Sequence, residues 1–270
     1  MSIEIKLDRD FSLRHIFDCG QCFRWNENAD GTYTGVAAKR AVNISYDGSI
    51  IRIDGAEKVD EAFFRDYLDI DRDYSAIKKR VSKNDVMKEA VAFGSGIRIL
   101  KQEFFESLMS FIISQRSSIP KIKGCVEKIC KTYGEERELS GKVYYTFPDA
   151  EALRDVKEED YAAFGVGYRA KYLEKAVSDI LSGKIDEKKI RSLKTPDARS
   201  ALLEIFGVGN KVADCVLLFS LSRFDSFPVD VWVKRAMDEY FEGADGYSLF
   251  GEDSGFAQQY LFYKMRNGSK

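Results

Sequence analysis

The sequence lacks any long hydrophobic run. No uninterrupted apolar stretch approaches the ~20 residues that span a bilayer, and the start, MSIEIKLDRD, has neither the basic flank nor the apolar stretch of a signal peptide. We therefore expect a soluble intracellular protein, cytoplasmic or nucleoid-associated if the source is prokaryotic, that is neither secreted nor bound to membranes. We expect it to be a monomer.

Cysteines are few and odd in number, which argues against the disulfide framework of a secreted protein. Cys19 and Cys22 form one C-x-x-C pair with His15 nearby, but a structural zinc site takes four ligands and the sequence offers no second cluster. We expect free thiols, no metal site and no required cofactor. The cysteines are Cys19, Cys22, Cys125, Cys130 and Cys215.

An excess of positive charge is also missing. The chain has 42 Lys and Arg residues against 44 Asp and Glu residues, a formal net charge of −2. Domains that bind nucleic acid through their overall charge are strongly basic, so any DNA site here has to be a local feature. With 270 residues, 44% of them hydrophobic, the chain is long enough to bury a substantial core.

Two kinds of hydrophobic pattern divide the chain. Near the N-terminus, short runs rich in β-branched and aromatic residues are separated by the turn signals Asp30-Gly31 and Asp47-Gly48, which predicts an antiparallel meander. The expected strands cover residues 21–25, 33–37, 40–46 and 49–53. We predict an α+β fold with an N-terminal antiparallel β-sheet domain at residues 1–82 and a mostly α-helical body at residues 83–270.

In the second part, apolar residues recur every three to four positions, as on helices with one buried face. The clearest stripes lie at 104–112 and 122–130, and similar patterns follow near 172–181, 198–205, 211–221, 233–241 and 256–264. The polar, glycine-containing stretches 134–142 and 243–255 are interpreted as loops.

The most informative segment is a helix-hairpin-helix at about residues 198–221, with a Gly-Val-Gly turn at Gly207 and Gly209. Two glycines let the chain reverse tightly, and the amides at the start of the second helix bind a phosphate without a basic side chain. Lys211 lies in the first turn of that helix, where the helix dipole favours the neutral, nucleophilic amine over the ammonium ion. Taken singly, a glycine at a helix end is an ordinary stop signal and most lysines are solvated surface groups.

Asp230 is the natural N-cap of the helix that starts after Pro228. As a cap it is expected to be ionised, and a fixed carboxylate could stabilise positive charge on a sugar as its glycosidic bond breaks, or help the lysine lose its proton. A plain capping role is the alternative.

Taken together, residues 207–215 (GVGNKVADC) and 228–230 (PVD) resemble the helix-hairpin-helix (HhH-GPD) DNA glycosylases, and within them the 8-oxoguanine DNA glycosylase/AP lyase branch. Further matching pieces follow the family's order at 20–25, 110–114, 167–172 and 256–258. The resemblance implies that Lys211 and Asp230 are catalytic in an enzyme that excises 8-oxoguanine from duplex DNA opposite cytosine. A Lys211 Schiff base and β-elimination would then cut the strand.

The resemblance also implies roles in recognition. The carbonyl of Gly20 would accept the N7 hydrogen of 8-oxoguanine, which guanine lacks; Phe262 and Cys215 would sandwich the flipped base, and Gln258 would bind its Watson–Crick edge. The DNA-binding residues implied are the wedge Tyr168, the cytosine-reading Arg169, and Arg116, Lys121, Gly207, Gly209 and Val212.

Three departures from the family pattern affect DNA contacts. Arg116 lies in a Gln-Arg-Ser-Ser run where the family often has asparagines, and Lys121 replaces a second cytosine-contacting arginine. Since lysine cannot form the planar fork of arginine, we expect looser discrimination of the opposite base. Trp232 replaces a common histidine that contacts a phosphate.

Two alternatives stay open: a glycosylase for another lesion, such as an alkylated base, and a non-catalytic helix-hairpin-helix module that only binds DNA. Lys211 argues against the first, because alkylated-base glycosylases use the aspartate without the lysine. A monovalent cation bound by the hairpin carbonyls is a further possibility that the sequence leaves open.

Overall fold

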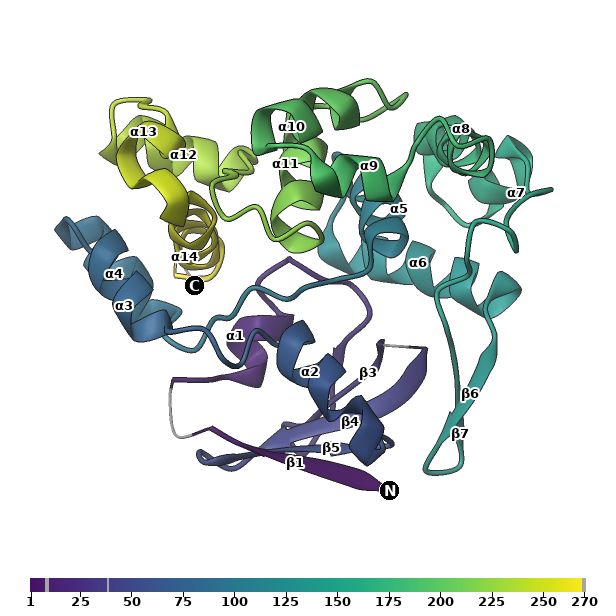
Figure 1. Cartoon of the computed structure of the whole chain (residues 1–270), viewed down its shortest axis with the longest axis horizontal. Coiled ribbons are helices and arrows are strands. Elements are labelled where there is room, and N and C mark those ends of the chain that lie inside the picture. The colour runs from purple at the N-terminus through teal and green to yellow at the C-terminus, as the bar shows by residue number, and fades with distance from the viewer. Residues whose placement is uncertain (8–9, 38, 269–270) are drawn as a thin grey trace.

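The computed structural model describes residues 1–7, 10–37 and 39–268. The strands of the N-terminal part gather in one sheet, with most helices packed above it (Figure 1). The sheet runs antiparallel in the order β1-β5-β4-β3-β2. Its strands are β1 (Ser2–Lys6), β2 (Asn26–Glu27), β3 (Tyr33–Ala37), β4 (Arg40–Tyr46) and β5 (Ile50–Asp54).

Alternation of side chains puts one face of the sheet into a core. In β5 the buried residues Ile51 and Ile53 flank the exposed Arg52. Ile53 pairs with Ile3 on β1 and with Ile44 on β4, so the apolar residues of three strands line up on the same face.

The strands predicted at residues 33–37 and 40–46 are confirmed. The strand predicted at 49–53 is also present and lies one residue later, at Ile50–Asp54. The prediction of a strand at residues 21–25 is wrong. This segment is a loop. The Gln21 side chain is fully buried and donates hydrogen bonds to the carbonyls of Ile16 and Arg98, both at 2.8 Å. It also accepts one from the amide of Leu100 at 2.9 Å, so it joins backbone segments in the way that a strand ladder otherwise would.

The helices are present at every position where a 3.6-residue pattern predicted one. The long helices that build the body are α5 (Phe104–Ser114), α6 (Ile119–Tyr133), α8 (Ala170–Leu181), α10 (Thr195–Leu203), α11 (Asn210–Phe219), α12 (Val231–Tyr240) and α14 (Ser254–Asn267). The remaining α-helices of the described residues are α1 (Leu13–Phe17), α2 (Glu61–Tyr67), α3 (Tyr74–Val81), α4 (Asp85–Phe93), α7 (Glu158–Ala163), α9 (Glu187–Ser192) and α13 (Gly246–Phe250).

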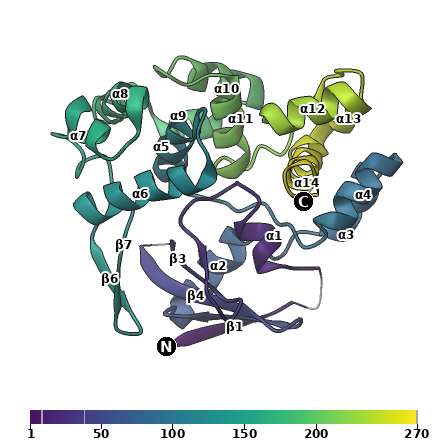
Figure 2. The ribbon, with the colours of Figure 1, turned by 180° about the vertical axis from the view of Figure 1, so that it is seen from behind.

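Both stretches interpreted as loops contain regular structure, so that interpretation is wrong. Residues 134–142 include β6 (Glu136–Leu139) and the start of β7 (Lys142–Tyr145), a hairpin that reaches down beside the sheet (Figures 1 and 2). Arg137 Nε donates to the carbonyl of Lys39 at 2.7 Å and fixes the hairpin there. In the second stretch, the Asp245 side chain caps the short helix α13.

The described residues form two hydrophobic cores, one on the sheet and one among the helices. The core on the sheet is built from residues up to Ile70, together with Leu100. The core among the helices contains Cys19 and Phe23 from the N-terminal part, and Tyr74 joins α3 to it. The domain boundary between residues 82 and 83 stays a prediction, because adjacent cores do not show which segments fold as separate units.

Helix α14 connects the parts of the fold that line the functional site. Seen from behind, it lies between α12 and the α3–α4 pair (Figure 2). Within residues 1–7, 10–37 and 39–268, no helix combines the length and apolar character of a membrane-crossing segment. All five cysteines are buried free thiols.

Candidate active site

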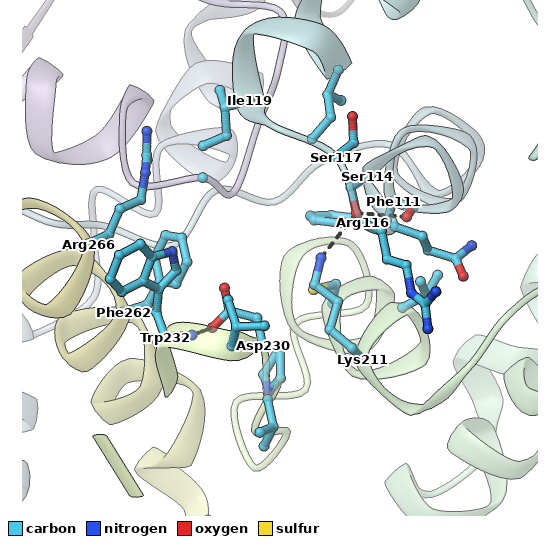
Figure 3. A pocket seen from close by; sticks show the side chains of 18 of the residues that line it. Phe111, Ser114, Arg116, Ser117, Ile119, Lys211, Asp230, Trp232, Phe262 and Arg266 are labelled. Carbon is cyan, nitrogen blue, oxygen red and sulfur yellow. Dashed lines mark hydrogen bonds between the residues drawn. The ribbon is translucent and has the colours of Figure 1, made fainter. Parts of the chain in front are cut away.

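A cavity of about 810 Å³ opens between the loop after α1, the C-terminal end of α5, the helix-hairpin-helix, the start of α12, and α14. Figure 3 shows its lining, with Lys211 and Asp230 extending from opposite walls. Gly20, Cys215, Gln258 and Phe262 lie in the same lining. The structure thus brings together six residues that the sequence analysis selected from four separate segments.

Lys211 occupies the first turn of α11, as predicted, with Gly209 as the N-cap of that helix. The side chain is half-buried, which excludes the interpretation as a solvated surface lysine. Its Nζ donates a hydrogen bond to Ser114 Oγ at 3.1 Å and lies 4.9 Å from the centroid of the Phe111 ring. Both contacts come from the last turn of α5 (Figure 3).

Asp230 is the N-cap of α12, also as predicted. Its Oδ1 accepts hydrogen bonds from the amides of Trp232 at 3.0 Å and Val233 at 2.9 Å. Burial nevertheless raises the pKa of the carboxyl group above its ordinary value, opposed by the Val233 amide and the Lys211 ammonium. The capping hydrogen bonds lower the pKa of the carboxyl group, but the effect of burial is larger and leaves the pKa above its ordinary value.

The loop that carries Gly20 is held against α14. Gly20 has φ +76°, and a Cβ atom there would lie 2.9 Å from Phe262 Cε1, so only glycine brings the backbone this close to the ring. Gln259 Nε2 donates to the Cys19 carbonyl at 2.6 Å, and an Arg266 guanidinium nitrogen donates to the Asp18 carbonyl at 3.0 Å. These bonds fix the loop at the wall of the cavity.

Gln258 and Cys215 supply buried groups to the cavity. Gln258 is only 4% exposed, and among the described residues its Oε1 has no hydrogen-bond partner. A buried amide oxygen without a partner is costly, so a ligand that donates a hydrogen bond to it would relieve the penalty. Burial raises the pKa of the Cys215 thiol to about 11, which keeps it neutral and able to pack against an apolar ring face.

The two hairpin glycines have different roles, which corrects the expectation that both are needed for the turn. Gly207 has φ +85°, and a Cβ atom there would lie 2.3 Å from the ring of Tyr172. Gly209 has an ordinary φ of −101°, and a Cβ atom there would have no neighbour within 4 Å. Gly209 therefore leaves open space in front of the amides of Asn210, Lys211 and the buried Val212.

Tyr168 and Arg169 lie in a short 3-10 helix (Gly167–Arg169) directly before α8, outside the cavity lining. Tyr168 is 50% exposed, as a wedge residue would be, but Arg169 is only 5% exposed. One guanidinium nitrogen donates to the Val166 carbonyl at 2.9 Å, another donates to the Gln115 carbonyl, and the group lies 4.5 Å from the centroid of the Tyr168 ring. Two guanidinium nitrogens are thus held by backbone carbonyls, whereas Nε is buried without a partner among the described residues.

The remaining predicted DNA contacts are exposed. Arg116 has a left-handed backbone with φ +47° and lines the cavity, whereas Lys121 lies on the exposed face of α6, outside the lining. Trp232 also lines the cavity, and the guanidinium of Arg235 lies 5.3 Å from the centroid of its ring.

Four residues that hold the site together received no role from the sequence: Phe111, Ser114, Gln259 and Arg266. The signal for the serine was present, since it ends the matching run at 110–114, but its contact with Lys211 joins positions 97 residues apart. Among the described residues, no group of three His, Cys, Asp or Glu side chains is arranged to hold a metal ion. A cation at the hairpin stays a prediction.

The site combines a hairpin with exposed amides and a cavity into which Lys211 and Asp230 extend, which is the arrangement expected of a helix-hairpin-helix protein of base excision DNA repair. The family model described as HhH-GPD superfamily base excision DNA repair protein matches residues 109–246, and the N-terminal domain model of 8-oxoguanine DNA glycosylase matches residues 3–108. The chain therefore belongs to the 8-oxoguanine DNA glycosylase branch of the HhH-GPD superfamily, which confirms the resemblance and the fold class.

Individual relatives agree with this assignment. The chain is 27% identical over 280 residues to N-glycosylase/DNA lyase OGG1 of Arabidopsis thaliana, covering 94% of this chain and 77% of that protein. It is 32% identical over 200 residues to the "Probable N-glycosylase/DNA lyase" of Methanothermobacter thermautotrophicus, covering 63% of this chain and 64% of the relative, just under two thirds of its length.

A solved structure is similar over almost the whole length of both chains. It is the Clostridium acetobutylicum 8-oxoguanine glycosylase/lyase in complex with double-stranded DNA containing cytosine opposite 8-oxoguanine. The identity is 40%, the TM-score is 0.94, and the alignment covers 97% of this chain and 94% of that one.

Proposed function

We propose that this protein is a bifunctional DNA glycosylase/AP lyase that excises 8-oxoguanine from duplex DNA, opposite cytosine, and then cuts the strand. One observation supports this most strongly: a half-buried lysine amine and a half-buried aspartate that caps a helix extend into the same cavity. The relative with 40% identity is itself named for both activities. The protein would work on DNA inside the cell, in agreement with its expected location.

The reaction would begin with extrusion of the damaged nucleotide into the cavity, since its sugar is out of reach while the base is stacked and paired. The neutral amine of Lys211 attacks C1′, the bond from C1′ to the base breaks, and the departing base takes up the proton that the nitrogen loses. The Asp230 carboxylate stabilises the positive charge that develops on the sugar. Ring opening gives a Schiff base between Nζ and C1′, and loss of a C2′ proton expels the 3′ phosphate by β-elimination.

Recognition of the lesion would use the groups that face the cavity from α14 and the Gly20 loop. The unpartnered Oε1 of Gln258 would accept hydrogen bonds from the N1 and exocyclic amino groups of the base. The Gly20 carbonyl would accept the N7 hydrogen, and the Phe262 ring and the neutral Cys215 thiol would cover the two faces.

A panel of duplexes tests the proposal. Single-turnover assays would compare 8-oxoguanine opposite each of the four bases, unmodified guanine, and an alkylated purine. Base loss and strand cutting at 8-oxoguanine, and at neither of the other two bases, is the expected result. Excision of the alkylated purine alone would favour the alternative glycosylase, and binding without any base loss would favour the DNA-binding module.

We expect excision to slow as the solution becomes more acidic. The carboxylate of Asp230 is the active form, and burial raises its pKa, so protonation removes activity at a pH above the ordinary aspartate pKa of about 4. Single-turnover rates measured from pH 4 to pH 8, with circular dichroism to confirm folding at each pH, would show this fall. If the residual activity of Asp230→Asn has the same acid limb, the limb arises from another group.

We expect Gly209→Ala to fold normally but to bind DNA about five- to tenfold more weakly, close to the value of one hydrogen bond. A methyl group at this position meets open space within the protein but stands between the α11 amides and a phosphate. Fluorescence anisotropy with a lesion duplex and a melting curve would measure the two effects. Gly207→Ala is the matched contrast and should instead lower the melting temperature, because of the Tyr172 ring. Unchanged affinity in Gly209→Ala would exclude a phosphate at these amides.

A further inference from the structure

The hydroxyl of Ser114 accepts a hydrogen bond from the Lys211 amine, with a distance of 3.1 Å between Nζ and Oγ. Ser114 is the last residue of α5, and its Oγ donates to the Phe111 carbonyl at 2.8 Å. A hydroxyl has one proton to donate and two lone pairs to accept with. Because its proton is used within α5, the oxygen accepts from Nζ at 3.1 Å and does not donate to it.

In the neutral amine that the proposed reaction requires, the bond to Ser114 does not use the nitrogen lone pair. A neutral amine has two hydrogens and one lone pair; a bond that uses one N–H orients the nitrogen without occupying its lone pair. The Phe111 ring, with its centroid 4.9 Å from Nζ, covers a second direction from the same end of α5. Figure 3 shows Ser114 and Phe111 together on one side of the amine, with Asp230 across the cavity.

We propose that Ser114 is a positioning residue for Lys211: its hydroxyl holds one N–H so that the lone pair of the neutral amine points into the cavity. The inference rests on the proposed function, in which this lone pair attacks C1′. Ser114 does not touch the reacting carbon and takes no proton. Its effect is orientation, and misplacement of a reacting group by about 1 Å costs roughly a hundredfold in rate.

The opposite possibility is that the bond is only a resting contact, which has to break before the amine can attack. The two possibilities predict different effects on the reaction rate when the hydroxyl is removed. If the hydroxyl positions the amine, removing it slows the reaction, whereas removal of a resting contact leaves the rate unchanged or increases it.

The test compares Ser114→Ala with Ser114→Thr, which keeps a hydroxyl on Cβ, and with Ser110→Ala, a buried serine one turn earlier on α5 and outside the cavity lining. Single-turnover excision and borohydride trapping would be measured with a duplex containing 8-oxoguanine opposite cytosine. Anisotropy would give the affinity of each variant for the same duplex, and melting curves would report folding.

We expect excision and trapping by Ser114→Ala to be about 10- to 100-fold slower, with affinity within about threefold of the unmodified protein. The threonine variant and Ser110→Ala should stay within about fivefold of its rate. Full activity in Ser114→Ala, or equal loss in Ser114→Thr at unchanged melting temperature, would overturn the inference. If the unmodified protein itself neither excises nor traps, the proposed function fails, and the inference with it.

Discussion

We expect Lys211→Gln to slow base excision and strand cutting together, each by at least about a thousandfold, while the protein still folds and binds lesion DNA. Glutamine has nearly the length of the lysine stem, and its amide nitrogen can still donate to Ser114 Oγ, but the nitrogen has no nucleophilic lone pair. The α11 hairpin and the open space at Gly209 are unaltered, so the phosphate contacts remain. Single-turnover assays with 8-oxoguanine and with a preformed abasic site would measure the two activities.

Lys188→Gln is the matched control, since it removes the same charge from an exposed position on α9, away from the cavity. Its activity should equal that of the unmodified protein. Substantial excision without strand cutting in Lys211→Gln would mean that water displaces the base, and the lysine would then act only as a lyase residue.

Asp230→Asn is expected to slow excision by about a hundred- to a thousandfold with little effect on folding or binding. Asparagine is as good an N-cap as aspartate, so its amide oxygen can still accept from the amides of Trp232 and Val233. What is lost is the negative charge opposite Lys211. Because that charge is held partly out of water, its electrostatic effect on a developing cation is larger than that of a surface carboxylate.

Asp238→Asn on the same helix gives the comparison for this variant. Asp238 forms an exposed ion pair with Lys234, and such pairs contribute little to stability. Its excision rate and melting temperature should match those of the unmodified protein. A fully active Asp230→Asn enzyme would remove the carboxylate from the mechanism and leave it only as a helix cap.

The fold was predictable from the sequence wherever periodicity alone decides the structure. Strands β3 and β4 and the helices of the body follow from patterns of apolar residues along single segments. The predictions of secondary structure are wrong where contacts between residues far apart in the sequence determine the local structure. Gln21 lies in a loop because its side chain binds backbone 77 and 79 residues away, and the β6–β7 hairpin forms against Lys39, 98 residues from Arg137.

In the candidate site, too, the local features were predictable from the sequence and the long-range contacts were not. The positions of Lys211 and Asp230 at helix starts are local features that the hairpin and the N-cap reveal. The Ser114 contact and the bonds of Gln259 and Arg266 to the Gly20 loop are formed between segments 97 to 248 residues apart, so no local pattern predicts them. The inward position of Arg169 also depends on such a contact, with the Gln115 carbonyl.

The most direct test of the mechanism is to locate the covalent bond itself. The protein would be incubated with a duplex containing 8-oxoguanine in the presence of borohydride, digested with a protease, and mapped by mass spectrometry. The predicted result is a deoxyribose remnant attached to the side-chain nitrogen at position 211. An adduct on any other residue, or base release at full rate without an adduct, would contradict it.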